Sequence, residues 1–313
     1  MDELNVLTLT SELGNLELLA NQVVEGFIIG MHKSPFHGFS AEFAEHRLYN
    51  SGESTRHIDW KVMARSEKVF VKRYEEETNL RCHVLLDNSG SMHYPEMKTT
   101  ADSHWNKITF SVVAASVLFN VLKRQRDAFG LTIFDDKIEI QTEAKSTTIH
   151  QKLLTTYLQK VLNEPFKKSE SNVAESIHLI ADKIHKRSLV ILFTDMFETS
   201  LNDDGNMEAI WSSLQHLKHN KHEVIIFHVT DKATEIDFEF ENRPYKFIDL
   251  ETGEELKLQP SEVKEKYKAH MHKFYAELKL KCSQFRIDLV EADVRKGFNQ
   301  ILLPYFVKRT KMM

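Results

Sequence analysis

The sequence predicts an α/β fold: a doubly wound, mostly parallel sheet with a β-rich N-terminal extension packed on it. Three observations favour this fold. From residue 81 onward, short apolar segments typical of strands alternate with longer segments of helical periodicity. Residues 189–193 are apolar without interruption, as in a strand covered on both faces. The chain has 313 residues, of which 42% are hydrophobic, so it is long enough for one large domain with an appendage.

Residues 1–80 form the predicted extension. Leucine, valine and phenylalanine residues at helical spacing predict a helix over 11–30, and a turn-rich connector follows it. The alternating pattern of residues 68–74 predicts a strand. This region is too small and too polar for a core of its own, so we expect it to pack on the domain formed by residues 81–310.

In that domain, the order of strands and helices predicts short, right-handed connections and helices on both faces of the sheet. An antiparallel excursion with a turn at Thr252 and Gly253 is expected within residues 237–259. The predicted strands are 82–87, 130–134 with a hairpin partner at 138–140, 189–193, 224–229 and 285–290, and the predicted helices are 104–126, 147–162, 172–187, 206–219, 261–281 and a short C-terminal one.

Charge and cysteine content exclude several classes of protein. The net charge of −5 and the absence of a basic stripe argue against nucleic-acid binding. Cys82 and Cys282 belong to no CxxC pair, which argues against zinc and disulfide frameworks. The most apolar long stretch, residues 112–122, is far shorter than the ~20 residues of a membrane span. The N-terminal residues lack the basic charges that begin a signal peptide, so we expect a cytoplasmic protein.

The most informative motif is Asp87-x-Ser89-x-Ser91, at the C-terminal end of the first strand of the domain. Ligands of open α/β sheets bind at this edge. One carboxylate and two hydroxyls are hard oxygen ligands for a small divalent cation. Neither serine has a G-x-S-x-G elbow around it, and a serine nucleophile needs a positioned base. The motif therefore indicates metal-dependent binding rather than catalysis.

Two further segments are expected at the same edge. Asp195 follows the strand at 189–193, and the loop before the helix at 172 carries Ser169 and Ser171. Oxygen ligands of this kind favour Mg²⁺, with Mn²⁺ or Ca²⁺ as alternatives, and an open coordination position would accept an acidic side chain of a partner protein. The predicted metal ligands are Asp87, Ser89, Ser91, Ser171 and Asp195.

This set of residues resembles the metal-ion-dependent adhesion site of von Willebrand factor type A domains. The resemblance implies a protein-binding domain that is not an enzyme. The middle residue of that site is usually threonine, and Ser171 stands in its place here. Serine keeps the hydroxyl and loses only the methyl group. Ser169 is the competing candidate for this position.

A second resemblance is more specific. Residues 42–47, followed by Arg56-His57-Ile58-Asp59-Trp60-Lys61-x-x-Ala64-Arg65, resemble the signature of domain of unknown function family 58, and residues 72–77 and 247–254 continue the likeness. In that family the signature precedes a von Willebrand A-like domain. The resemblance implies an adaptor or co-chaperone of a MoxR-type AAA+ ATPase, with the ATPase or its client as the partner.

The role of the signature residues Arg56, Asp59, Trp60, Lys61 and Arg65 has two interpretations. In the structural one, Asp59 forms an ion pair with Arg56 or Arg65 and Trp60 is an apolar anchor for the extension. In the other, these residues contact the partner.

Two alternatives to a metal-dependent binding module stay open at this point. A metal-dependent phosphoesterase would use Mg²⁺ to polarise a phosphoryl oxygen, but the motif lacks a second acid and a clear general base. The second alternative is a scaffold protein whose site no longer binds a metal. The sequence has no Walker A motif, which excludes a P-loop ATPase.

Overall fold

The computed structural model describes residues 15–32, 46–48, 70–72, 80–96, 105–164, 173–196, 204–250 and 253–312. The chain divides into two compact units, one made of Met1–Phe27 and Leu80–Met313, the other of Ile28–Asn79. In the smaller unit, strands β1 (His46–Leu48) and β2 (Phe70–Lys72) pair in antiparallel fashion. Strand β2 lies within the predicted strand at 68–74. The signature residues Arg56, Asp59, Trp60, Lys61 and Arg65 lie outside the described residues, so both interpretations of their role stay predictions.

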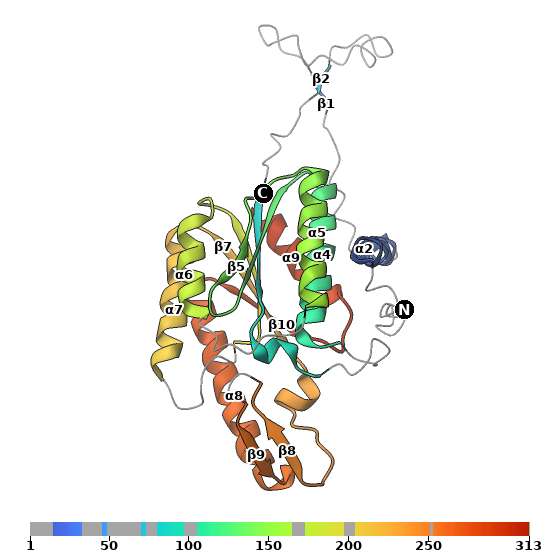
Figure 1. The fold of residues 1–313 in the computed structure, drawn as a ribbon. Coiled ribbons are helices and arrows are strands. Elements are labelled where there is room, and N and C mark those ends of the chain that lie inside the picture. The colour runs from blue at the N-terminus through green and yellow to red at the C-terminus, as the bar shows by residue number, and fades with distance from the viewer. Residues whose placement is uncertain are drawn as a thin grey trace. The chain divides into compact units, whose positions relative to one another are not determined.

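The larger unit is built on a six-stranded sheet with the order β10-β7-β6-β3-β4-β5 (Figure 1). All neighbouring strands are parallel except β4 and β5, which form the predicted hairpin. The predicted doubly wound, mostly parallel sheet is therefore confirmed. Its strands are β3 (Arg81–Asp87), β4 (Ala128–Phe134), β5 (Ile138–Gln141), β6 (Leu189–Thr194), β7 (Glu223–Thr230) and β10 (Asp288–Asp293).

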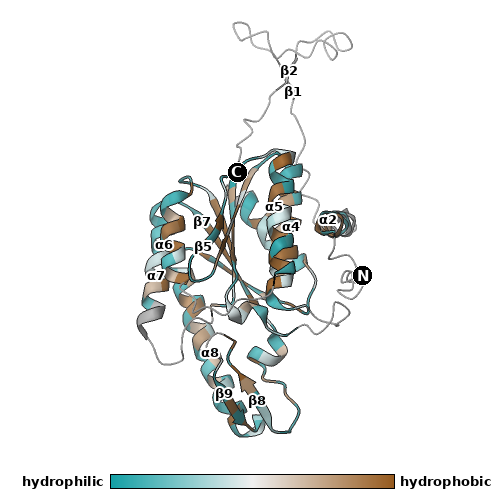
Figure 2. Ribbon diagram, viewed as in Figure 1, coloured by the Kyte–Doolittle hydropathy of each residue, from teal (hydrophilic) through white to brown (hydrophobic). Residues whose placement is uncertain are grey.

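The central strands are apolar on both faces because helices cover both. Every residue of β6 is buried, and Leu86 of β3 is opposite Ile133 on one side and Phe193 on the other. In Figure 2 the strands of the sheet are largely brown, the colour of hydrophobic residues. Parallel pairing in this register brings the carboxyl ends of β3 and β6 to the same edge of the sheet.

The helices form two layers, with α4 and α5 on one side of the sheet and α6 and α7 on the other (Figure 1). Buried apolar side chains of α4, α5, α2 and α9 form one core, and those of α6, α7 and α8 form the other. The helices are α2 (Leu16–His32), α4 (Lys107–Arg124), α5 (Thr148–Asn163), α6 (Val173–Lys183), α7 (Asp204–His219), α8 (Pro260–Gln284) and α9 (Asn299–Met312).

The last strand of the sheet lies three residues later than predicted. Helix α8 extends to Gln284, and β10 covers Asp288–Asp293 rather than residues 285–290. The chain leaves the helix through Arg286, which has a φ of 55°, and the N–H of Ile287 donates to the carbonyl of Cys282. This left-handed turn ends the helix without a glycine, so the sequence carries no stop signal there.

The predicted antiparallel excursion is the hairpin of β8 (Tyr245–Ile248) and β9 (Glu255–Leu258), which together with the first half of α8 extends beyond the carboxyl edge of the sheet (Figure 1). Phe238 joins the hairpin to α8, because its ring stacks on Phe247 and lies 4.6 Å from the ring of Tyr267, centroid to centroid. Both cysteines are buried and free. Of the helices in the described ranges, none combines the length and apolarity needed to cross a bilayer.

Helix α2 offers a test of its attachment to the sheet. Leu19 is fully buried in the core beside α4, whereas its neighbour Leu18 is 46% exposed. We expect Leu19→Ala to lower the free energy of unfolding by about 2–4 kcal/mol, because it removes buried methyl groups and leaves a cavity. Leu18→Ala should change it by less than about 0.5–1 kcal/mol. Urea denaturation measures both, and equal effects would contradict the packing of α2 on this core.

Candidate functional site

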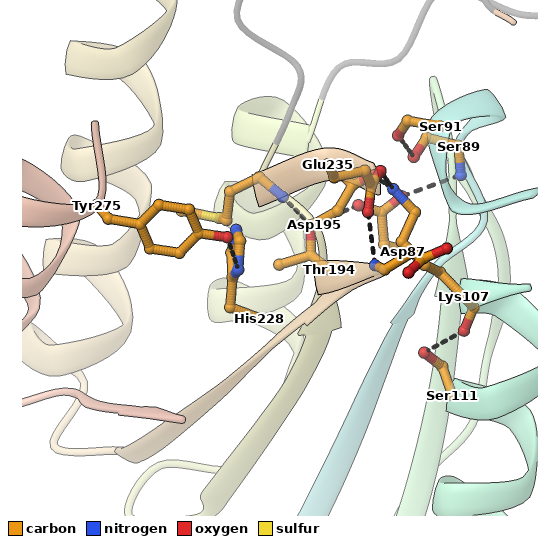
Figure 3. Close-up of polar contacts among 12 residues, drawn as sticks. Asp87, Ser89, Ser91, Lys107, Ser111, Thr194, Asp195, His228, Glu235 and Tyr275 are labelled. Carbon is orange, nitrogen blue, oxygen red and sulfur yellow. Dashed lines mark hydrogen bonds and ion pairs between the residues drawn. The ribbon is translucent and has the colours of Figure 1, made fainter. Parts of the chain in front are cut away.

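The predicted acids lie together at the carboxyl edge of the sheet (Figure 3). Asp87 is the last residue of β3, and Asp195 directly follows β6. Both side chains are almost completely buried. Ser171 and the competing Ser169 lie outside the described residues, so the structure does not place the third predicted segment.

The carboxylate of Asp87 is held on both oxygens. The backbone N–H of Ser89 donates to Oδ1 at 2.9 Å, and the hydroxyl of Thr194 donates to Oδ2 at 2.6 Å. Burial and then the nearby charge of Asp195 raise the pKa of Asp87 well above its ordinary value, and these hydrogen bonds oppose the shift only in part. The two strand ends therefore place their acids close enough to repel each other.

The two serines of the motif lie side by side. Ser89 has extended backbone angles and precedes a short 3-10 helix, Gly90–His93, so the chain turns sharply after Asp87. This turn brings the hydroxyl oxygens of Ser89 and Ser91 to 3.2 Å from each other. Oxygens at adjacent positions of an octahedron with metal–oxygen distances of about 2.1 Å are roughly 3 Å apart. The spacing fits two neighbouring ligands of Mg²⁺.

A lysine that the sequence analysis did not single out completes the cluster. Lys107 begins α4, after the N-cap residue Asn106, and its side chain is fully buried. Its ammonium lies 2.7 Å from Oδ2 of Asp195, and it also forms an ion pair with Glu235. Burial alone would lower the pKa of Lys107, but the two carboxylates outweigh it and hold the pKa above its ordinary value. Lys107 is therefore a permanent cation beside Asp195.

Glu235 belongs to a short π-helix, Lys232–Ile236, that follows β7. Its other carboxylate oxygen accepts the backbone N–H of Asp231 at 2.7 Å, and its carbonyl accepts the hydroxyl of Tyr267 from α8 at 2.8 Å. Burial raises the pKa of Glu235 to about 6, although Lys107 opposes the shift. Asp231 in turn accepts two hydrogen bonds from Arg295, at 2.7 and 2.8 Å. This side of the cluster is therefore rigidly held.

Further along the edge, His228 of β7 is buried next to α8. The hydroxyl of Tyr275 lies 3.1 Å from its Nδ1 (Figure 3). Burial lowers the pKa of His228 to about 4, so the imidazole is neutral at pH 7. His228 therefore adds no positive charge beside Asp195.

The charges of the cluster suit a cation. Asp87, Asp195 and Glu235 are three carboxylic acids, and Lys107 supplies one positive charge among them. Among the described residues, no three histidine, cysteine or acidic side chains converge as a metal-binding group. A metal ion here would therefore need the hydroxyls of Ser89 and Ser91, with carboxylates bound directly or through water. The donor set fits Mg²⁺, which accepts such ligands and keeps several waters.

One sequence signal could have identified Lys107. A lysine in the first turn of a helix is unfavourable, because the helix dipole places partial positive charge there. The rest of α4 down to Leu122 is apolar or small except for Asn120. A lysine that starts such a helix needs an acid to compensate it. No comparable signal marks Glu235, because its contact with Lys107 joins residues 128 positions apart.

The ion pairs of Lys107 can be tested through stability. We expect Lys107→Met to lower the free energy of unfolding at neutral pH by about 3–5 kcal/mol, because it leaves buried carboxylates without a counter-charge. The double variant Lys107→Met, Glu235→Gln should be less destabilised, since one of those charges is gone. Lys152→Met, at an exposed position of α5, is the control and should change stability by about 0.5 kcal/mol or less.

Chemical denaturation in the presence of EDTA measures these differences without any contribution from metal ions. If the double variant is as unstable as Lys107→Met, the pairing of Lys107 with Glu235 does not contribute as the geometry indicates.

Three solved structures share features of this fold at low sequence identity. They are the conserved hypothetical protein BatB from Bacteroides thetaiotaomicron (13% identical, 75% of this chain and 100% of that chain, TM-score 0.43), an aerotolerance-related membrane protein from Bacteroides fragilis (12%, 74% and 99%, TM-score 0.44) and the SpRpn10 VWA domain (14%, 48% and 75%, TM-score 0.33).

Curated relatives are found in mycobacteria. Uncharacterized protein Rv1480 of Mycobacterium tuberculosis and uncharacterized protein Mb1516 of Mycobacterium bovis are each 23% identical to this chain over 225 residues. The aligned region covers 71% of this chain and 65% of each relative.

The family model described as "Protein of unknown function DUF58" matches residues 45–276, which include most of the sheet and the Asp-x-Ser-x-Ser motif. The match extends over well more than half of the chain. The chain belongs to the DUF58 family.

Proposed function

We propose that this protein is a non-enzymatic interaction module that binds a partner protein through a Mg²⁺ ion at the carboxyl edge of its sheet. The observation that carries the proposal is the pair of hydroxyls of Ser89 and Ser91, 3.2 Å apart, beside buried acids. Asp87, Ser89, Ser91 and Asp195 are the proposed ligands on described residues, with Ser171 as the proposed third segment. Mn²⁺ and Ca²⁺ are the alternative ions.

Within this proposal, Asp87 contributes to metal binding indirectly, through the serine loop and a metal-bound water. Both of its carboxylate oxygens already accept hydrogen bonds, from the Ser89 N–H and from the Thr194 hydroxyl. Asp87 is therefore suited to orient the serine loop and to hold a metal-bound water, while the serine hydroxyls contact the ion. Neutral hydroxyl ligands leave the ion with most of its charge, which favours an acidic side chain at an open coordination position.

Lys107 adds a positive charge next to the proposed ion. Its ammonium occupies one oxygen of Asp195, so the ion and the lysine would share this carboxylate. An ammonium so close to the ion weakens cation binding by repulsion. We infer that Lys107 limits the affinity for Mg²⁺ and keeps the cluster stable when no metal is bound.

The proposed partner is a MoxR-type AAA+ ATPase or a client of that ATPase, for which this protein would act as adaptor or co-chaperone in the cytoplasm. The support is the resemblance of residues 42–77 to the family signature and the membership of the DUF58 family. A metal-dependent phosphoesterase is less well supported, because Asp87 is engaged on both oxygens and is not presented as a nucleophile.

The metal can be tested by unfolding the protein with and without Mg²⁺. An ion bound only by the folded state raises stability by about 2.7 kcal/mol at a concentration of 100 times its Kd. We expect Mg²⁺ to stabilise the wild-type protein. The double variant Ser89→Ala, Ser91→Ala should abolish this stabilisation, and Lys107→Met should increase it. The control Ser261→Ala, Ser283→Ala removes two exposed hydroxyls of α8 and should respond as the wild type does. No response of the wild type, or an equal response of the serine variant, would contradict the proposed site.

The partner can be tested with a purified MoxR-type ATPase from the same genome. We expect the immobilised wild-type protein to retain the ATPase in Mg²⁺ and to release it in EDTA, because the ion bridges the two proteins. The variant Ser89→Ala, Ser91→Ala should retain little of it under either condition. Equal retention in Mg²⁺ and EDTA would separate the partnership from the metal and refute the proposed mechanism.

A further inference from the structure

A cavity of about 510 Å³ lies at the amino edge of the sheet, opposite the edge that carries Asp87. Its wall is formed by the start of β3, the segment after β5 and the end of α6. The volume is in the range of sites for small molecules, about 300–1,000 Å³. The lining residues with polar side chains are Arg81, His83, Gln141, Thr142, Glu143, Lys183 and His185.

The cavity has an excess of positive charge. Among the residues that the structure describes, neither Arg81 nor Lys183 has a carboxylate within 4.0 Å. Glu143, the acid in the lining, pairs with Lys145 at 3.0 Å, so its charge is already compensated. Two cations without acidic partners that face one cavity favour an anion as its occupant.

Arg81 is held in place by a neighbouring imidazole. The Nδ1 atom of His185 lies 2.8 Å from the carbonyl of Lys186 and donates to it, which leaves Nε2 as the acceptor of the ring. The guanidinium Nη1 of Arg81 lies 3.2 Å from Nδ1 and 3.4 Å from Nε2 of this ring, and only Nε2 can accept its hydrogen bond. Only part of the guanidinium is used in this contact, so its remaining N–H groups are available to a ligand.

His83 supplies an unsatisfied buried group in the same wall. The side chain is only 3% exposed, and its Nδ1 has no hydrogen-bond partner among the described residues. A buried polar atom without a partner is unfavourable. This nitrogen is closed off from the cavity and lies against Gly130, so a hydrogen bond from the ring to a ligand would come from Nε2. Burial lowers the pKa of His83 to about 4, so it contacts the cavity as a neutral imidazole that can donate one hydrogen bond.

The neighbouring strand leaves room for the imidazole of His83. Gly130 of β4 is directly opposite His83, and a Cβ atom at Gly130 would lie 2.7 Å from Cε1 of His83. No side chain other than hydrogen fits there without displacement of the ring. Glycine within a strand is unfavourable relative to alanine and marks a close approach of other groups. Two unfavourable features therefore coincide at the wall of one cavity.

We propose that this cavity is a binding site for a small organic anion with a carboxylate or phosphate group. Arg81 and Lys183 bind the anionic group by charge-assisted hydrogen bonds, and His83 donates to it or to the adjoining part of the molecule. The site is separate from the proposed metal site and does not depend on the proposed function. It gives the protein a second, ligand-dependent surface at the end of the sheet away from the partner site.

The test uses inorganic phosphate, succinate and AMP as probes, each titrated by calorimetry into the full chain at constant ionic strength with chloride as the balancing anion. We expect at least one probe to bind the wild-type protein and to shift the ring resonances of His83, assigned by comparison with His83→Gln. The variant Arg81→Gln, Lys183→Gln should bind that probe ~10-fold more weakly or worse, because it loses two charge-assisted contacts. Both residues are exposed, so the variant should fold normally.

The control variant Lys152→Gln, Lys266→Gln removes the same charge from exposed positions outside the cavity and should bind as the wild type does. Tighter binding of phosphate than of succinate would identify a phosphate site, and the reverse a carboxylate site. Tighter binding of AMP than of phosphate would show that the cavity also holds the organic part of the ligand. Failure of all three probes, or equal affinity of the Arg81 and Lys183 variant and the wild type, would overturn the proposal.

Discussion

The buried ammonium of Lys107 joins three segments that are distant in sequence, because it contacts Asp195 after β6 and Glu235 after β7 from the first turn of α4. A buried lysine is tolerated only when its charge is paired, so neither acid can move away without a large penalty. The contact therefore fixes the separation of α4, β6 and the π-helix at the carboxyl edge. Asp87 and the serine loop are positioned against this fixed group through Thr194, which precedes Asp195 and donates to Asp87.

The same contact extends the cluster toward the part of the chain outside the sheet. Glu235 is bonded to Lys107 by its side chain and to Tyr267 of α8 by its carbonyl. Tyr267 packs on Phe238, and Phe238 stacks on Phe247 of the β8–β9 hairpin. A change in the charge near Asp195 therefore has a continuous path of packed groups to the hairpin.

The sequence predicted those features that depend on local pattern. Runs of apolar residues identified the buried strands, and the acids that end two of them were expected at one edge because parallel strands align their carboxyl ends. Lys107 and Glu235 were missed because their pairing depends on tertiary structure and not on spacing. The start of β10 was misplaced for a different reason, since Arg286 takes a left-handed conformation that normally favours glycine. Ser171 and the signature around Trp60 lie outside the described residues, so their roles stay predictions.

The two ends of β3 carry opposite chemistry. Its carboxyl end presents Asp87 among acids, and its amino end presents Arg81 and His83 to a cavity whose cations have no acidic partner among the described residues. The strand between them is fully buried and hydrogen-bonded to β4 and β6 on both sides. Such a strand cannot slide without breaking both ladders, so it is a poor route for movement from one end to the other. Binding at the two ends should therefore be thermodynamically independent, unless α6 transmits it. Helix α6 begins at Val173, two positions after Ser171 in the sequence, and ends at Lys183 in the wall of the cavity. Any coupling between a cation at one edge and an anion at the other would consequently depend on a shift of this helix rather than of the sheet.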